Sequence, residues 1–292
     1  MPWVGLQTYG QPPAQGASPA SERFPHDTSP IPTRHRRHFR AAPQPAPARS
    51  RIRRDHPPPA SLANHGRPRP RVLDVGCGPG RAALLLAAEA DAHVVAVDLH
   101  QPFLDELAGT AAEQDLSERI STVNCSMDRL PFPDHSFDII WAEGAVYNIG
   151  FGTALQAWRR LLAPNGVLVV TEIEWSTATP APPTKTFWAG SYPLRTTEEN
   201  RAAAQSAGYR VSAHYPLPES DWWDEYYTLL SERLDTADPT RPGMAEAIST
   251  QREEIALRRE YGADYRYAGY VLHPAHPVGT GSNDIPGPRP DR

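Results

Sequence analysis

Residues 71 to 81 read Arg-Val-Leu-Asp-Val-Gly-Cys-Gly-Pro-Gly-Arg and decide the fold of this 292-residue chain. An apolar strand runs into three glycines, and helix-forming residues follow directly. Glycine adopts backbone conformations that are closed to other residues, and it lets a ligand approach the main chain without meeting a Cβ atom. The stretch therefore predicts a ligand-binding turn between a strand and a helix.

The spacing of these glycines separates two kinds of nucleotide site. A dinucleotide fingerprint reads Gly-x-Gly-x-x-Gly, and its third glycine admits a pyrophosphate at the start of the helix. Gly76, Gly78 and Gly80 instead follow the pattern Gly-x-Gly-x-Gly. Arg81 stands where the third fingerprint glycine would be, and Asp74 lies two residues before the first glycine. The spacing favours a different ligand, with an NAD-linked oxidoreductase as the alternative.

Four further segments follow the glycine turn in a fixed order. Together with the turn, they resemble the ordered motifs of class I S-adenosylmethionine-dependent methyltransferases, across roughly 100 residues. The segments are His93 to Val97 ending in Asp98, Ser126 to Phe132, Ser136 to Trp141, and Leu161 to Gly166 leading into Val167 to Thr171.

The resemblance implies S-adenosylmethionine as the cofactor and assigns residues to its parts. The glycine loop would pack against the methionine part, and Asp98 would accept hydrogen bonds from both ribose hydroxyls, a device that NAD enzymes share. Asp128 would hold the adenine amino group, with Met127 packed on the ring. The predicted cofactor-binding residues are Asp74, Gly76, Gly78, Gly80, Asp98, Leu99, Met127 and Asp128.

From residue 71 onward, short runs rich in Val, Ile and Leu alternate with longer helical patterns. This alternation predicts an α/β fold, a Rossmann-like, doubly wound and mostly parallel seven-stranded sheet whose last strand is antiparallel. We expect strands near 71–75, 93–98, 119–124, 136–142, 166–172, 208–216 and 265–272. Helices are expected over 80–90, 101–113, 152–163 and 196–207.

Two insertions rich in aromatic residues are predicted to lie over the substrate site. Residues 175–195 are long for a loop, and their aromatic content argues for an ordered segment. Residues 219–262 predict two helices that are broken at Arg241-Pro242-Gly243. The aromatic rings are either buried within these segments or form the substrate wall. The predicted substrate residues are Trp175, Trp188, Tyr192, His214 and Trp222.

Polar residues that end the fourth and fifth strands are candidates for the chemistry. Glu143, at the end of the fourth strand, is the first choice for a polar group near the methyl group, and Tyr147 follows within one turn. Glu172 and Glu174, which end the fifth strand, are weaker candidates. A general base is useful where the acceptor is a hydroxyl or a protonated amine.

The segment after the fourth strand narrows the classes of molecule expected to accept the methyl group. Methyltransferases of nucleobase amino groups or protein glutamine commonly carry an Asp/Asn-Pro-Pro-Tyr-like tetrad there, whereas this chain has Ala142-Glu143-Gly144-Ala145. No carboxylate grouping for Mg²⁺ is evident, and no metal is predicted. The chain resembles the bacterial small-molecule group that includes the ubiquinone and menaquinone enzymes (methyltransferase type 11/25). This implies methyl transfer to an O or N atom of a small molecule; a catalytically silent S-adenosylmethionine-binding module is a further alternative.

Composition divides the chain into unlike parts. The first 70 residues hold 15 of the 33 prolines and 11 arginines against three acidic residues, so the rest of the chain, whose total charge is −5, is strongly acidic. We predict disordered tails over 1–68 and 276–292 and a methyltransferase domain over 69–275. Nucleic acid would bind only through the basic tail.

The remaining expectations concern location and assembly. No stretch approaches the ~18 apolar residues of a spanning helix, and no secretory signal is evident, so we expect a cytoplasmic protein without a membrane partner. Two cysteines without metal-like spacing fit reduced thiols in that compartment. A small-molecule acceptor is the expected partner, and the chain is expected to be a monomer or a homodimer.

Overall fold

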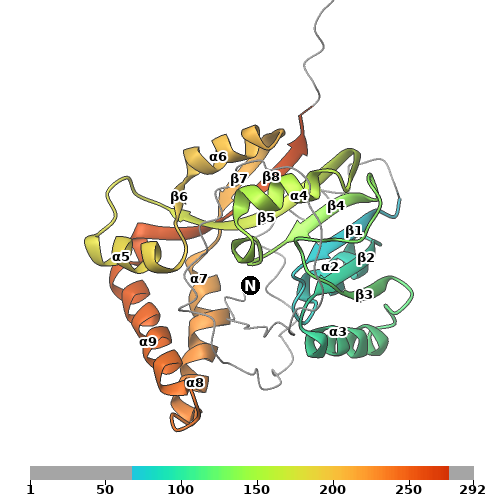
Figure 1. Cartoon of the computed structure of the whole chain (residues 1–292). Helices are drawn as coiled ribbons and strands as arrows, with labels where there is room; N and C mark the ends of the chain where they lie inside the picture. Colours follow the sequence, from blue (N-terminus) through green and yellow to red (C-terminus); the bar gives the residue numbers. More distant parts are fainter. Residues whose placement is uncertain (1–67, 276–292) are drawn as a thin grey trace, which may run out of the picture.

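A computed structural model describes residues 68–275 of the protein, without the side chains of residues 221, 222, 225 and 226. The predicted tails over 1–68 and 276–292 lie outside the described residues, apart from residue 68. Seven strands follow the order β3-β2-β1-β4-β5-β8-β7, and the two-residue strand β6 pairs with β5 at the side (Figure 1). The strands are β1 (Arg71–Val75), β2 (His93–Asp98), β3 (Ile120–Asn124), β4 (Phe137–Ala142), β5 (Leu162–Trp175), β6 (Arg195–Thr196), β7 (Tyr209–Pro216) and β8 (Tyr265–Pro274).

The sheet is parallel from β3 to β5, and β8 runs antiparallel to both of its neighbours, β5 and β7. The predicted fold class is therefore confirmed. The sheet has one strand more than predicted because β6 was hidden in the segment over 175–195. Strand β5 also begins four residues before its predicted start and continues to Trp175, so that it can pair with β8 along Leu168 to Trp175.

Helices cover both faces of the sheet, as the alternating sequence pattern predicts. One apolar cluster packs α4 and α6 against one face, around Trp158 and Tyr270, and the other packs α2 and α3 against the opposite face, around Leu86 and Leu107. The helices are α2 (Arg81–Glu89), α3 (Gln101–Glu113), α4 (Phe151–Arg159) and α6 (Thr197–Ser206). Each begins within one residue of its predicted start. Because the faces are closed by helices, the carboxyl ends of the parallel strands form the edge at which ligands bind in such folds.

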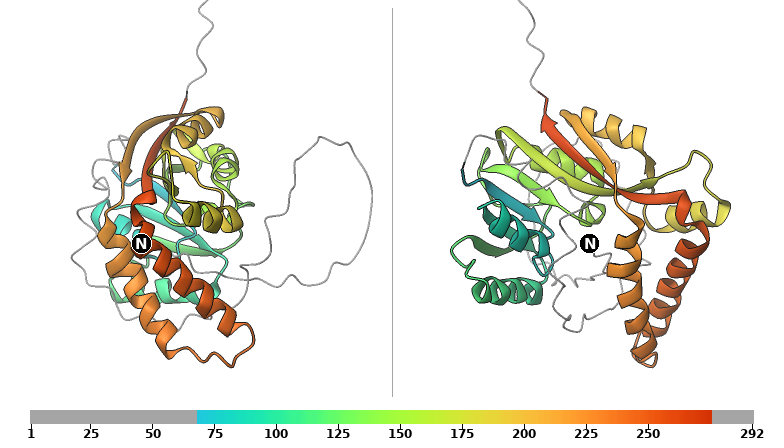
Figure 2. Two further views of the ribbon diagram at one scale, coloured as in Figure 1. Left: turned by 90° about the vertical axis from the view of Figure 1, so that its left-hand side faces the viewer. Right: turned by 180° about the vertical axis from the view of Figure 1, so that it is seen from behind.

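The two insertions form a helical group beside the end of β5 and the beginning of β8 (Figure 2). A third apolar cluster joins this group to the ends of β5 and β8, around Trp188, Tyr227 and Tyr265. The first insertion contains α5 (Pro182–Ser191); the second contains α7 (Glu219–Trp222), a π-helical turn (Trp223–Tyr227), α8 (Thr228–Thr236) and α9 (Met244–Tyr261). The predicted break at 241–243 is confirmed, and the π-helical turn was not predicted.

Candidate functional site

The glycine turn has three glycines with positive φ, and they serve different purposes. A Cβ atom on Gly76 would lie 2.7 Å from the Ala145 Cβ, and one on Gly80 would lie 2.1 Å from Leu107 Cδ1. These two glycines are therefore required by close packing within the protein. Gly78, with φ of +53°, has no described heavy atom within 4 Å of a Cβ placed on it. The backbone at Gly78 is thus open to a ligand.

Asp98 ends β2 directly beside this turn. Its Oδ2 accepts a hydrogen bond from the Gly78 amide at 3.0 Å, and its Oδ1 accepts one from the His100 amide at 2.8 Å. Each oxygen of a carboxylate has a second lone pair, so Asp98 is fixed in orientation and can still accept two hydroxyl donors. Leu99, the next residue, is a large apolar side chain that remains 41% exposed. An apolar ring could pack on it without displacing any part of the fold.

Asp74 lies in β1 below the turn and is almost fully buried. Its Oδ2 has no hydrogen-bond partner within residues 68–275. Burial raises the pKa of Asp74 well above its usual value, and the nearby charges of Glu143 and Asp98 raise it further. A buried polar atom without a partner costs about 1–3 kcal/mol. A hydrogen-bond donor or cation from a ligand would remove that cost.

Met127 and Asp128 follow β3, and their side chains differ in how they are placed. The Met127 Cε would be 3.4 Å from a Cβ on Gly76, and the Met127 carbonyl accepts a hydrogen bond from Trp158 Nε1 at 2.8 Å. Asp128 has a side chain that is 46% exposed, with its carboxylate 3.8 Å from Arg129 Nε. The structure therefore fixes Met127 against the glycine turn and leaves the Asp128 carboxylate at the surface.

Glu143 and Tyr147 follow β4, in the loop that leads to α4. The amide of Gly144 donates to Thr171 Oγ1 at 2.8 Å, which ties this loop to the end of β5. Glu143 lies close enough to Asp74 for its charge to raise the pKa of that carboxyl. Burial raises the pKa of Tyr147, so its phenol stays protonated at neutral pH. The catalytic roles of Glu143 and Tyr147 stay predictions.

The predicted substrate residues do not form one group. Trp188 is buried among Phe187 and Tyr265, with ring centroids 5.2 and 5.1 Å away, and Trp175 is half-buried in the same cluster. Tyr192 is also half-buried against this cluster, and its ring centroid lies 6.5 Å from that of Tyr147. Trp222 lies in α7, and its side chain is outside the described residues. Of these aromatic residues, Tyr192 is the one that the structure brings next to a predicted catalytic residue.

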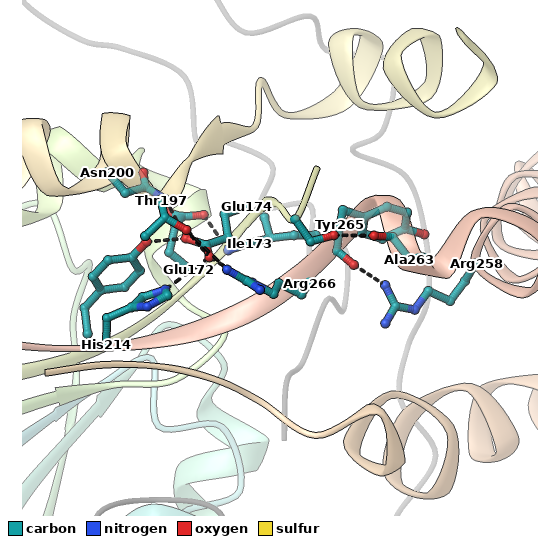
Figure 3. A network of polar contacts seen from close by, with 12 residues as sticks. Glu172, Ile173, Glu174, Thr197, Asn200, His214, Arg258, Ala263, Tyr265 and Arg266 are labelled. Carbon is teal, nitrogen blue, oxygen red and sulfur yellow. Dashed lines mark hydrogen bonds and ion pairs between the residues drawn. The ribbon is translucent and has the colours of Figure 1, made fainter. Parts of the chain in front are cut away.

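His214, also predicted to contact substrate, is engaged by a buried carboxylate. Its Nε2 lies 3.1 Å from Glu174 Oε1, which Arg266 Nε also reaches at 3.0 Å (Figure 3). We call the set Glu174, Thr197, Asn200, His214, Arg266 and Tyr270 the Glu174 network. Although burial opposes ionisation, hydrogen bonds from Tyr270, Thr197 and Arg266 outweigh it and lower the pKa of Glu174.

Glu172, one of the two weaker candidates from the sequence, is held by two hydrogen bonds in a buried position. It is 2% exposed, its Oε2 accepts a hydrogen bond from the Tyr192 hydroxyl at 3.0 Å, and its Oε1 accepts one from the Ile173 amide at 2.8 Å. Burial raises the pKa of Glu172 to about 8, within the range where proton transfer at neutral pH is effective. Its partner Tyr192 lies 20 residues away in another element, so no sequence spacing could have paired them.

Within residues 68–275, no group of three His, Cys, Asp or Glu side chains is arranged to hold a metal ion. The same residues include no helix with the length and apolar character needed to cross a membrane.

Comparisons with known proteins agree with this geometry. A family model described as a methyltransferase domain matches residues 72–166. A sterol 24-C-methyltransferase of Gibberella zeae is 32% identical over 107 residues, which are 36% of this chain and 28% of that protein. Phosphoethanolamine N-methyltransferase 3 of Arabidopsis thaliana is 25% identical over 190 residues, 64% of this chain and 37% of that protein. The chain thus spans about a third of the length of these curated relatives.

Solved structures share the fold. A SAM-dependent methyltransferase from Geobacter sulfurreducens, in complex with S-adenosyl-L-homocysteine, superposes with a TM-score of 0.62 over 74% of this chain and 90% of that chain, at 21% identity. The family match assigns residues 72–166 to a methyltransferase domain, and the superposition shows that the chain shares the fold of a SAM-dependent methyltransferase.

The residues at the rim fit the cofactor of this class. Asp98 has lone pairs for two ribose hydroxyls, Leu99 and Met127 offer apolar surface for the adenine ring, and the open backbone at Gly78 leaves room for the methionine part. The unpartnered oxygen of Asp74 suits a cationic group.

Proposed function

We propose that this protein transfers a methyl group from S-adenosylmethionine to an oxygen or nitrogen atom of a small-molecule acceptor. The observation that carries the proposal is the open backbone at Gly78, next to an Asp98 carboxylate that is held in place with lone pairs to spare. A turn of this shape suits a nucleoside with a small charged tail. The third fingerprint glycine that a pyrophosphate needs is replaced by Arg81.

The chemistry asks the protein chiefly for alignment. The bound cofactor supplies an activated methyl group, and methyl transfer is an in-line displacement in which holding two reactants together removes about 7–11 kcal/mol of the barrier. The glycine turn and Asp98 would fix one reactant, and the segment from Glu143 to Tyr147 would border the other. Thr171 holds that segment to β5 through the Gly144 amide, so the two sides of the site keep their spacing.

An oxygen or nitrogen acceptor is supported by the groups on the acceptor side. Glu172 is hydrogen-bonded to Tyr192, whose ring lies beside that of Tyr147, and an acceptor that must lose a proton could use this acid–base pair. The relatives named above include a C-methyltransferase and an N-methyltransferase, so the methylated atom needs a direct test.

The test is release of S-adenosylhomocysteine with three kinds of acceptor. Phosphoethanolamine offers an amine, catechol offers hydroxyl groups, and a sterol offers carbon. We expect product with the amine or the hydroxyl probe. Product from the sterol alone, with the new methyl group on carbon and not on the sterol hydroxyl, would contradict the O or N assignment. Cofactor binding without product from any class of acceptor would favour a silent binding module.

We further propose a cytoplasmic protein, monomeric or dimeric, that does not act at a membrane. Two cysteines that form no disulfide, Cys77 and Cys125, are in keeping with a reducing compartment.

The basic tail is the part that would bind nucleic acid. Retention on RNA at low salt, compared between the full chain and a protein that begins at Arg69, tests this, and equal retention would exclude a role for the tail.

A further inference from the structure

A buried carboxyl and three phenols gather at the rim next to the predicted methyl-transfer position. We call Glu172, Tyr192, Tyr147 and Tyr267 the Glu172 cluster. Tyr192 donates its hydroxyl hydrogen to Glu172 and stands edge-on to the Tyr147 ring, at an interplanar angle of 76°. The pKa of Tyr267 is raised by burial and also by Tyr147, Glu172, Glu254 and Tyr192, so each of these residues lies within electrostatic range of Tyr267.

A chain of close contacts joins this cluster to the cofactor side. The glycine turn meets Ala145, since a Cβ on Gly76 would lie 2.7 Å from the Ala145 Cβ. The neighbouring Gly144 amide donates to Thr171 at 2.8 Å, and Thr171 directly precedes Glu172. The Glu172 cluster is therefore only a few residues from the turn that would hold the cofactor. An acceptor between the two would touch the cluster.

The two members of the hydrogen-bonded pair differ in accessibility. Glu172 is 2% exposed, whereas Tyr192 is half-buried and keeps part of its surface open. Burial and the charge of Glu172 raise the pKa of Tyr192, and the nearby Phe151 backbone, at the start of α4, opposes that rise. With its hydrogen donated to Glu172, the hydroxyl oxygen keeps lone-pair capacity to accept a hydrogen bond from a ligand. A proton from a ligand would therefore reach Glu172 by way of Tyr192.

We propose that Tyr192 and Glu172 form a proton-accepting pair for the hydroxyl or amine group that is methylated. This inference rests on the proposed function and narrows the acceptor to one that must lose an O–H or N–H proton. As the new bond to the methyl group forms, the acceptor proton moves to the Tyr192 oxygen and the Tyr192 phenolic proton moves to the Glu172 carboxylate. The carbon–sulfur bond breaks with its electron pair remaining on sulfur. A sulfonium and a carboxylate thus give a thioether and a carboxylic acid.

The surroundings of Glu172 suit a group that takes up a proton. Burial raises its pKa to about 8, hydrogen bonds from Tyr192 and the Ile173 amide oppose that rise, and Arg195 opposes it by charge. Glu172 is thus ionised above about pH 8, and the rate of methyl transfer should rise with pH through that value. The other titratable groups that face it, from its own strand, β8 and the loop after β4, are Glu174, Tyr267, Tyr270 and Tyr147.

The first test is a double-mutant cycle on the acceptor that gives product, phosphoethanolamine or catechol. Tyr192→Phe and Glu172→Gln should each lower the single-turnover rate by about 10²-fold to 10⁴-fold. The double variant should lose no more than the worse single one, because residues that act as a unit are not additive. The rise of the rate with pH near 8 should disappear in Glu172→Gln.

Tyr209→Phe is the matched control for Tyr192→Phe. Its hydroxyl is also buried, donates to the Leu155 carbonyl at 3.1 Å, and lies between α4 and β7 away from the rim. The control should keep its rate and pH profile, and all variants should bind S-adenosylmethionine as the wild type does. Equal losses in the control and Tyr192→Phe, additive losses in the cycle, or an unchanged pH profile in Glu172→Gln would overturn the pairing.

A second readout needs no turnover. Infrared difference spectra of the protein without ligands should show a carboxyl that loses its proton near pH 8, and this signal should vanish in Glu172→Gln, whereas the signal of Glu254, whose pKa burial raises to about 7, should remain. Persistence of the signal near pH 8 in that variant would overturn the assignment even if the activity tests fail for lack of folding. The two proposals fail separately. A wild type without product from any acceptor defeats the proposed function, whereas a wild type with product and unaltered variants defeats only the pair.

Discussion

The Glu174 network and the Glu172 cluster shift the pKa of a buried glutamate in opposite directions. Both glutamates lie on β5, two residues apart, and both are almost fully buried (Figure 3). Glu174 accepts hydrogen bonds from Arg266 and from several neutral donors, and its pKa is lowered. Glu172 receives one phenol and one amide, and its pKa is raised to about 8. The number and charge of the donors, set against the effect of burial, separate a fixed anion from a carboxyl that can exchange a proton.

The largest expected contrast is in stability. Glu174→Gln removes the negative charge from a buried site and leaves Arg266 without its counter-charge, so we expect the free energy of unfolding to fall by about 3 kcal/mol. Glu172→Gln should not lower it at neutral pH, because the native carboxyl must take up a proton on folding there, whereas an amide need not. Urea denaturation of the two isosteric variants measures this. Equal losses would show that the two sites do not differ as described.

The pH dependence of stability should have opposite signs at the two sites. A raised pKa makes the folded state hold a proton that the unfolded chain releases, so the contribution of Glu172 is complete below its ordinary pKa of 4.5 and is lost as pH rises to about 8. The loss is about 1.4 kcal/mol per pH unit at most. The contribution of Glu174 is present above pH 4.5 and is lost as pH falls through its lowered pKa.

Denaturation at about pH 5 and about pH 8 separates these two contributions. The stability of the wild type relative to Glu172→Gln should decrease between the two values. Relative to Glu174→Gln, it should stay nearly constant. A wild-type advantage over Glu172→Gln that grows with pH would mean that Glu172 is an ordinary, stabilised anion.

The smallest expected effect concerns His214, which was predicted to contact substrate but is engaged by Glu174. Because its ring is 3.1 Å from Glu174, His214→Gln should cost about 1 kcal/mol of stability and leave the KM for the acceptor unchanged. Acceptor titrations with this variant measure KM. A raised KM with unaltered stability would instead place His214 in the substrate wall, as the sequence predicted.

The sequence predicted the strands and the glycine turn of the cofactor side because their signals are local. Strands β1 and β2 have their predicted bounds, since runs of apolar β-branched residues end at Asp98 and at the glycine turn. The sequence does not reveal why each glycine of the turn is needed. That Gly80 faces Leu107 and Gly78 faces open space depends on how α3 packs, which no spacing encodes.

The acceptor side was predicted only in outline because its contacts join distant segments. Aromatic content correctly indicated ordered insertions, but it could not tell that Trp188 packs in a core while Tyr192 reaches Glu172. The carboxylates of Glu172 and Glu174 look alike in sequence. Their difference arises from α5, α6, β7 and β8, which converge on β5 only in the folded chain.

Calorimetric binding of S-adenosylmethionine tests the central claim most directly. The wild type should bind it, and Asp98→Ala should bind it at least ~100-fold more weakly, because two hydrogen bonds to a charged acceptor are lost. Gly78→Ala should also weaken binding, since the added methyl group occupies the open side of the turn. Asp105→Ala, which removes an exposed carboxylate from α3, is the control and should bind normally. Unchanged affinity in Asp98→Ala, or NAD binding in place of S-adenosylmethionine, would contradict this account of the site.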